Sequence, residues 1–242
     1  MYTRAGEKFQ KIMSAIADNL QAIRDRIARA ANAAGREDSG IRLLAVSKTK
    51  PLSDIEAALA AGQTAFGENY VQEGVEKCLA LGVDRGLEWH FIGPLQSNKS
   101  RSVAEHFDWV HTVDRLKIAE RLSTQRPAHF PPLQVCVQVN ISGEASKSGC
   151  TPAEALVLCQ QVSQLPRLQL RGLMAIPEPA DDIAQQREPL RRLRVLFDEI
   201  RAAGLPLDTL SMGMSHDLEA AIAEGATLIR IGTAIFGERN NA

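Results

Sequence analysis

The stretch Leu43-Leu-Ala-Val-Ser-Lys-Thr-Lys-Pro51 predicts a short buried strand that ends beside a lysine. Its first four residues form an apolar run, and Pro51 cannot continue a strand ladder because it lacks a backbone N–H. Lys48 is therefore expected at the C-terminal end of the strand, where α/β proteins build their sites. A lysine held there among apolar neighbours can lose its proton near neutral pH and attack a carbonyl carbon. A solvated lysine in a turn fits the stretch equally well, so the rest of the chain has to decide.

A strand–helix pattern repeats along the chain after this stretch. Eight short apolar or β-branched segments end in polar residues, and helical segments lie between most of them. In a chain of 242 residues this alternation fits a closed (β/α)8 TIM barrel of parallel strands best. An open doubly wound sheet is the alternative, but its glycine fingerprint is absent after the early strands. The expected strands span residues 43–48, 65–70, 88–93, 109–114, 134–141, 170–177, 209–214 and 227–233. The expected crossover helices span residues 53–61, 71–81, 116–123, 151–165, 185–203 and 215–224.

A long amphipathic helix is expected ahead of the barrel, over residues 7–34. Its apolar residues recur at three- and four-residue steps, and Gly35 is a plausible stop. The barrel itself is expected over residues 41–239, and no Pro/Gly/Ser-rich linker divides the chain, so we expect a single domain over residues 1–242. The apolar positions of the helix are Phe9, Ile12, Ile16, Leu20, Ile23 and Ile27.

The composition argues against several classes of protein. With 28 Lys+Arg against 29 Asp+Glu, the net charge of −1 gives no overall field for nucleic acid or an anionic membrane. No apolar run reaches the roughly 20 residues that span a bilayer, and the charged start lacks the apolar core of a signal peptide. The 4 cysteines show no metal-ligand spacing, so we expect no metal site and reduced thiols in a cytoplasmic protein.

The carboxyl ends of all the strands of a barrel meet at one mouth. The fifth strand indicates which residues face inward, because Val135, Val137, Val139 and Ile141 alternate with Gln134, Cys136, Gln138 and Asn140. The apolar set suits contact with the outer helices, and the polar set then lines a polar site, unless those groups only satisfy one another. The residues that the strands bring to the mouth are Lys48, Glu68, Asn69, Tyr70, His90, Ile92, His111, Asp114, Asn140, Met174, Ile176, Met212, Gly213, Ser215, Arg230, Gly232 and Thr233.

The ends of the last two strands predict an anion site. Ser215 is a good helix N-cap, and Gly213 lets another group approach the backbone. Gly232 and Thr233 provide a second glycine turn and a hydroxyl, again before a short helix. Backbone N–H groups at two helix starts make an anion cradle, which is the usual phosphate position in these barrels. Capping alone would explain Ser215 and a turn alone would explain Gly232, but their joint occurrence favours phosphate.

Arg230 lies inside an apolar strand, where an arginine needs a partner. The partner is either a core carboxylate such as Glu68 or the ring nitrogen of a ligand held between Arg230 and Lys48. An imine-forming lysine, a phosphate cradle and an internal arginine together describe a pocket for pyridoxal 5′-phosphate, with Lys48 as its Schiff-base lysine. Because arginine keeps its proton, the ring nitrogen would stay unprotonated and the ring would be a weak electron sink.

Six segments of the chain carry a resemblance to a known family: Leu-Leu-Ala-Val-Ser-Lys48-Thr-Lys-Pro, Phe-Gly-Glu-Asn-Tyr70-Val-Gln-Glu, Trp-His-Phe-Ile-Gly93-x-Leu-Gln-x-Asn-Lys, Gly-Leu-Met174-Ala-Ile-Pro, Leu-Ser-Met-Gly-Met-Ser215 and Ile-Arg-Ile-Gly-Thr233-Ala-Ile-Phe-Gly. Together they closely resemble those of the pyridoxal-phosphate homeostasis proteins (the YggS/PROSC type). The resemblance implies a single-domain barrel similar to the N-terminal barrel domain of alanine racemase, with pyridoxal 5′-phosphate as cofactor. It also implies that Lys48, not Lys50, carries the Schiff base and that Arg230 lies near the ring nitrogen. Ser215, Gly232 and Thr233 match phosphate-binding positions, and Asn69 and Met212 match lining positions.

The function that the resemblance implies is intracellular cofactor homeostasis, as a carrier or buffer without robust catalytic turnover. Transient contact with apo-enzymes that use the cofactor is the expected partner interaction. A pyridoxal-phosphate-dependent amino-acid racemase-type enzyme or decarboxylase, a cofactor-free Schiff-base aldolase and a regulatory sensor remain alternatives. Two-base racemisation needs an acid–base group on each face of the substrate carbon. In the alanine racemase architecture a separate domain of a partner subunit provides the second group, a tyrosine, whereas this chain has only Tyr2 and Tyr70 and no expected room for that domain.

Overall fold

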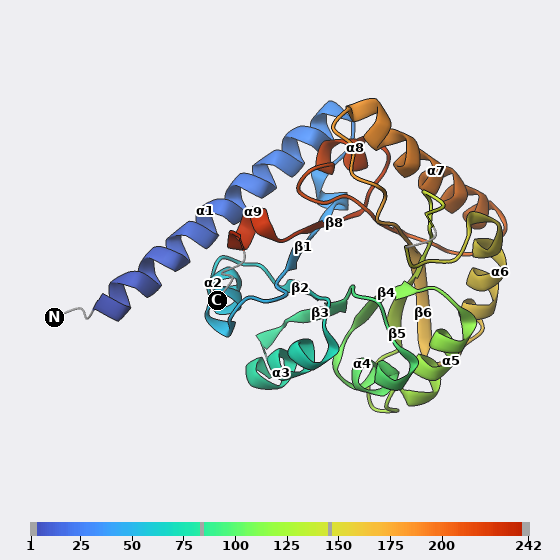
Figure 1. Cartoon of the computed structure of the whole chain (residues 1–242), viewed down its shortest axis with the longest axis horizontal. Coiled ribbons are helices and arrows are strands. Elements are labelled where there is room, and N and C mark those ends of the chain that lie inside the picture. Colours follow the sequence, from blue (N-terminus) through green and yellow to red (C-terminus); the bar gives the residue numbers. More distant parts are fainter. Residues whose placement is uncertain (1–3, 83–84, 145–146, 239–242) are drawn as a thin grey trace.

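Eight parallel strands close into one barrel in chain order in the computed structural model, with β8 pairing to β1 (Figure 1). The structure describes residues 4–82, 85–144 and 147–238, and side chains from residue 12 onward. The expected TIM barrel is confirmed, and the open doubly wound sheet was the wrong alternative. The strands are β1 (Arg42–Val46), β2 (Ala65–Glu68), β3 (Glu88–Phe91), β4 (Trp109–Val113), β5 (Leu133–Gln138), β6 (Leu168–Met174), β7 (Thr209–Ser211) and β8 (Leu228–Ile231).

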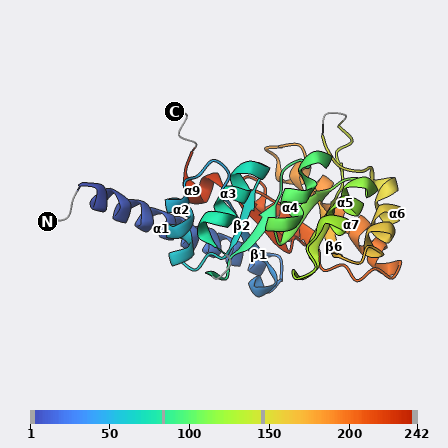
Figure 2. The ribbon, with the colours of Figure 1, turned by 90° about the horizontal axis from the view of Figure 1, so that it is seen from below.

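Helices surround the barrel, and α1 extends beyond it (Figures 1 and 2). All six crossover helices that the sequence predicts are present, and Thr151 and Glu154 form the expected capping box ahead of α6. The sequence pattern predicts no helix at α4, a short segment between β3 and β4. The helices are α1 (Arg4–Ala33), α2 (Leu52–Ala60), α3 (Val71–Leu81), α4 (Ser100–His106), α5 (Leu116–Gln125), α6 (Pro152–Ser163), α7 (Ile183–Ala202), α8 (Leu218–Ala223) and α9 (Thr233–Phe236), with short 3₁₀ turns η1 (Asp38–Gly40) and η3 (Ser97–Lys99).

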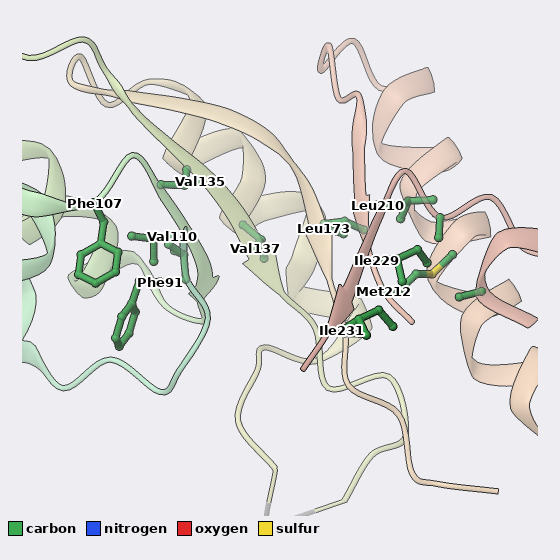
Figure 3. Packing of buried hydrophobic residues seen from close by; sticks show 14 of the residues in the cluster. Phe91, Phe107, Val110, Val135, Val137, Leu173, Leu210, Met212, Ile229 and Ile231 are labelled. Carbon is green, nitrogen blue, oxygen red and sulfur yellow. The ribbon is translucent and has the colours of Figure 1, made fainter. Parts of the chain in front are cut away.

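An apolar layer fills the space between the strands and the helices (Figure 3). Val135 and Val137 of β5 are buried in this layer, as the alternation along the fifth strand predicts. Leu210 and Met212 also belong to it and pack with Ile229 of β8. The side chain of Met212 therefore faces the helices and not the barrel interior, which differs from its expected place among the lining side chains.

The barrel interior holds two small apolar clusters with polar side chains between them. Leu44, Ala65, Ile92 and Leu228 form one cluster, and Trp109, Cys136 and Met174 form the other. The side chain of Cys136 thus points into the barrel, whereas those of its neighbours Val135 and Val137 point toward the helices. The predicted orientation of the fifth strand is therefore confirmed. Buried polar residues lie on the inward faces of β3, β4, β7 and β8, and they are His90, His111, Ser211 and Arg230, respectively.

The first helix, α1, contacts α2, α8 and α9 and so lies across the seam where β8 closes on β1. Arg26 of α1 forms an ion pair with Glu219 of α8, and Arg36 donates to the carbonyls of Ile222 and Ala226. The predicted amphipathic face is confirmed by the buried positions Ile16, Leu20, Ile23 and Ile27, whereas the side chain of Phe9 lies outside the described residues.

Two further features bear on the sequence predictions. Leu79 of α3 is apolar but 67% exposed, whereas Lys77 and Cys78 of the same helix are buried. All the cysteines, Cys78, Cys136, Cys150 and Cys159, are buried and unpaired. Over the described ranges, no helix combines the length and the apolar character needed to cross a membrane.

Candidate functional site

Lys48 lies two residues beyond the end of β1 and is partly buried. Leu44 and Val46 face the barrel interior, and Lys48 lies in the turn that follows this strand. In the register of the neighbouring strand, Leu44 pairs with Arg230 of β8. Arg230 thus lies on the strand next to β1, the strand whose C-terminal end leads to Lys48.

The second lysine of the opening stretch, Lys50, is held by the end of the chain. Its Nζ donates to the carbonyl oxygens of Phe236, Gly237 and Glu238, at 3.0, 2.9 and 2.8 Å. These carbonyls lie at the C-terminal end of α9, where a positive charge is favourable. The three bonds give Lys50 a structural task, which agrees with Lys48 as the expected cofactor lysine.

The guanidinium of Arg230 is buried inside the barrel, with 4% of the residue exposed. Nη1 donates to the Ser211 hydroxyl at 2.7 Å, and Nη2 donates to the Ala175 carbonyl at 2.9 Å. The proposed ion pair with Glu68 is wrong, because Glu68 lies on the helix side of β2 and bonds to Lys77. Burial lowers the pKa of Arg230 to about 10, so the guanidinium stays charged at neutral pH.

A chain of hydrogen bonds runs from Arg230 through the barrel to Glu88 on β3. Ser211 Oγ lies 2.7 Å from His111 Nδ1, His111 Nε2 lies 2.8 Å from His90 Nδ1, and His90 Nε2 lies 2.6 Å from Glu88 Oε1. The carboxylate of Glu88 can only accept, so His90 carries its proton on Nε2 and accepts on Nδ1. His111 must then donate from Nε2 and accept from Ser211, which fixes one direction for every bond in the chain.

The protonation states in this chain follow from burial and pairing. Burial lowers the pKa of both His90 and His111, so both rings are neutral at pH 7. Burial alone would raise the pKa of Glu88, but the hydrogen bond from His90 and the nearby charge of Arg42 lower it to about 2. The chain therefore holds a carboxylate at one end and a guanidinium at the other, with two neutral rings between them.

The expected phosphate end of the site differs from the prediction in one detail. Ser215 does not cap α8, because that helix begins at Leu218 with Asp217 at its N-cap. The carboxylate of Asp217 accepts from the N–H of Met214 at 2.7 Å, and the carbonyl of Ser215 accepts from Arg26 at 2.8 Å. Asp217 occupies the N-cap position, but its carboxylate holds the backbone ahead of the helix and does not cap the helix itself. The Ser215 hydroxyl is thus not used for capping.

Both predicted glycine turns are crowded by protein. A Cβ on Gly213 would lie 2.5 Å from the Cβ of Ala221, so the group that comes close to this backbone is α8 itself. A Cβ on Gly232 would lie 3.2 Å from the Val46 carbonyl oxygen, which brings the start of α9 against the end of β1. Thr233 follows as the first residue of α9, and the first N–H groups of a helix have no acceptor within it.

A cavity of about 260 Å³ opens at the mouth on the side of β2 to β6. Asn69 and Thr112 line this cavity, and the side-chain oxygens Asn69 Oδ1 and Thr112 Oγ1 are buried without a hydrogen-bond partner among the described residues. Thr112 was not predicted as a site residue, and its β-branched position inside a strand gave no signal. Buried polar oxygens that face a cavity suit a polar ligand.

The donor set at the mouth fits pyridoxal 5′-phosphate. An amine on Lys48, a fixed guanidinium on Arg230 and the N–H groups and hydroxyl at Thr233 provide the chemistry that its aldehyde, ring nitrogen and phosphate need. Tyr70, the one tyrosine among the described residues, precedes α3 and is 53% exposed.

Comparison with known proteins agrees with this assignment. Residues 19–240 match the family described as alanine racemase, N-terminal domain. The chain is 60% identical over 228 residues to the pyridoxal phosphate homeostasis protein of Pseudomonas aeruginosa, covering 94% of this chain and 97% of that protein.

Solved structures extend the comparison to the fold. The structure of PipY from Synechococcus elongatus with PLP bound is 38% identical, with a TM-score of 0.80, and the match covers 92% of this chain and 100% of that one. Alanine racemase from Corynebacterium glutamicum shares the fold at 17% identity and a TM-score of 0.70, over 93% of this chain and 62% of that one.

Proposed function

The chain belongs to the pyridoxal phosphate homeostasis protein family, and on that premise we propose that it binds pyridoxal 5′-phosphate and serves as a carrier or buffer of the cofactor. Lys48 would hold the cofactor through its Nζ amine, which would condense with the cofactor aldehyde as a Schiff base and release one water. When bound, the cofactor supplies an electron-withdrawing ring. We propose a single cofactor-binding domain over residues 1–242.

One observation carries this proposal: the guanidinium of Arg230 is fixed, charged and buried on the strand next to that of Lys48. Its partners Ser211 and the Ala175 carbonyl hold two of its nitrogens, so the guanidinium has one orientation. A charged guanidinium donates to a ring nitrogen and does not protonate it. The residues here would therefore bind the ring while leaving it a poor stabiliser of negative charge, which suits storage better than turnover.

The remaining contacts are proposed from the mouth. Ser215, Gly232 and Thr233 would bind the phosphate through hydroxyl and backbone N–H groups. Asn69 would line the site from the cavity side, where its Oδ1 needs a partner. Met212 would support the site only through its backbone just beyond β7, because its side chain packs among the helices.

The near-UV and visible absorbance of the purified protein tests the proposal. A Schiff base between Lys48 and the cofactor gives a band that free lysine does not give, and the Lys48→Ala variant should lose it. The matched variant Lys50→Ala should keep the band, because Lys50 bonds to α9. A band that survives in Lys48→Ala and disappears in Lys50→Ala would refute the assignment.

A racemase-type enzyme that uses the cofactor is the second candidate, favoured by the fold shared with alanine racemase. Its second acid–base group would have to be Tyr70, whose ring is half exposed. Assays of D- and L-amino acids separate the two candidates: turnover of roughly 1 per second or faster would refute the carrier proposal.

We further propose that the cofactor passes to apo-enzymes by transient contact. A purified apo-enzyme added to the loaded protein should gain activity while the absorbance band of the carrier falls. We place this role in the cytoplasm, because the four unpaired thiols are typical of a reducing compartment.

A further inference from the structure

A buried ionic network lies directly behind the turn that carries Lys48. Lys77 of α3 is 6% exposed, and its Nζ donates to Glu68 Oε1 at 2.9 Å, to Glu73 Oε1 at 2.6 Å and to the Ser47 carbonyl at 2.7 Å. The Ser47 hydroxyl also donates to Glu68 Oε1, at 2.5 Å. One ammonium thus joins α3, the end of β2 and the backbone just before Lys48.

The same network holds the backbone just after Lys48. The N–H of Thr49 donates to Glu73 Oε1 at 2.5 Å, and this oxygen is the one that Lys77 also binds. The residues on both sides of Lys48 are therefore fixed to one pair of α3 side chains, Glu73 and Lys77, which lie one helical turn apart. Neither side chain belongs to the proposed cofactor contacts at the barrel mouth.

The turn needs such support because Thr49 is strained. Its φ of 62° lies in the left-handed region, and Thr49 is the only non-glycine residue of the described chain with a positive φ. A β-branched residue is especially unfavourable there. The charge-assisted bond from its N–H to Glu73 offsets that strain. Strain that persists beside a reactive side chain is a mark of a positioned site.

Glu68 anchors the network at the end of β2, on the side of that strand that faces α3. Burial raises the pKa of Glu68 even though Lys77 opposes the shift, and its second oxygen, Oε2, has no hydrogen-bond partner within the described residues. A buried carboxylate with an unsatisfied oxygen destabilises a protein unless a cation pairs with it, and Lys77 is that cation for Glu68. An ordinary Glu–Lys pair on a solvent-exposed helix face needs no buried carboxylate of this kind.

We propose that Lys77 and Glu73 are positioning residues that hold the turn 47–49 so that Lys48 is directed into the barrel mouth. The inference rests on the proposed function, since it takes Lys48 as the cofactor anchor. It predicts that loosening the turn slows bond formation at Lys48 without removing the cofactor contacts at Arg230 and Thr233. Mispositioning of a reacting group by about 1 Å can cost up to about 100-fold in rate.

The test uses the Glu73→Ala variant with Glu76→Ala as its control. Both residues are glutamates of α3, but Glu76 bonds only to Gln72 on the exposed face among the contacts of the described chain. Glu73 has a side chain that is 26% exposed, so its replacement leaves a folded protein, whereas Lys77→Met would strand two glutamates and is the harsher variant. Cofactor-free protein is mixed with pyridoxal 5′-phosphate, and the rise of the absorbance band is followed by stopped flow.

We expect the band to form about tenfold or more slowly in Glu73→Ala than in Glu76→Ala. Glu73→Gln keeps an acceptor for the Thr49 N–H and should restore most of the rate. Hydrogen exchange of the Thr49 amide should be faster in Glu73→Ala and unchanged in Glu76→Ala, and this measurement needs no cofactor.

An unchanged rate in Glu73→Ala, or a lower melting temperature with the rate intact, would overturn the positioning role. So would unchanged exchange at Thr49. A wild-type protein that forms no band would refute the cofactor anchor instead, and the exchange measurement would still decide whether Glu73 holds the turn.

Discussion

The Ser211→Ala variant tests the hydrogen-bond chain that runs from Arg230 to Glu88. The Ser211 hydroxyl is fully buried, accepts from Arg230 and donates to His111. Its removal leaves one N–H of the guanidinium and the Nδ1 lone pair of His111 without partners in a dry interior. Each loss costs about 1–3 kcal/mol, so we expect the free energy of unfolding to fall by about 2–6 kcal/mol.

The assay is urea unfolding of the cofactor-free protein at pH 7, followed by circular dichroism. For a chain of this size, at about 2–4 °C per kcal/mol, the loss corresponds to a melting temperature about 4–24 °C lower. Ser123→Ala is the matched control, because Ser123 is also buried but its hydroxyl accepts one long bond, 3.4 Å from the N–H of Arg167. If the free energies of unfolding of both variants fell by the same amount to within about 0.5 kcal/mol, the Ser211 hydroxyl would not accept from Arg230 and donate to His111 at the same time.

Three further outcomes are expected. Lys50→Ala should lower the free energy of unfolding by about 1–3 kcal/mol, since three carbonyls at the end of α9 lose a charged donor, and this loss is measured by urea unfolding alongside the absorbance band that the variant keeps. The pKa values of His90 and His111 are lowered on folding, so their neutral forms add stability that is complete above the unfolded value of 6.5 and is lost as the pH falls below it. The free energy of unfolding, measured from pH 8 to 5, should fall by up to about 2.7 kcal/mol per pH unit below pH 6.5. A free energy that does not change with pH over this range would contradict two buried neutral rings. Gly172→Ala should prevent correct closure of the barrel, because its Cβ would lie 1.7 Å from the Thr209 carbonyl oxygen on β7, and native yield after refolding against the solvent-facing Gly40→Ala measures this.

The strands could be predicted from the sequence because parallel strands are buried on both faces and appear as apolar runs. Every predicted strand nevertheless ends one to three residues too late, as at Lys48 and Tyr70. The residues at these positions are of types that also occur in strands, but their backbones no longer pair with a neighbouring strand and instead form the barrel mouth. The α4 helix was missed because it is only 7 residues long and buries little besides Val103 and Ala104.

The site was less accessible to prediction than the fold. Lys48 and Arg230 could be singled out because each is a charged residue beside an apolar run. Ser211 and His111 are 100 residues apart in the chain, so their bond depends on a register that no local pattern reveals. Lys77 resembled an ordinary solvated helix lysine, and only its spacing of four from Glu73 hinted at a pair.

The position of α1 has a consequence for the order in which the protein can be completed. Arg26 and Glu219 are separated by 193 residues, so α1 is synthesised long before the segment that carries its partner. Until that segment is present, α1 lacks the contacts that α8 and α9 make with it in the folded protein. The same late contact ties the two ends of the fold together, so fraying of the seam between β8 and β1 requires α1 to detach as well. Contacts of α1 that form after the rest of the barrel would slow unfolding more than they speed folding.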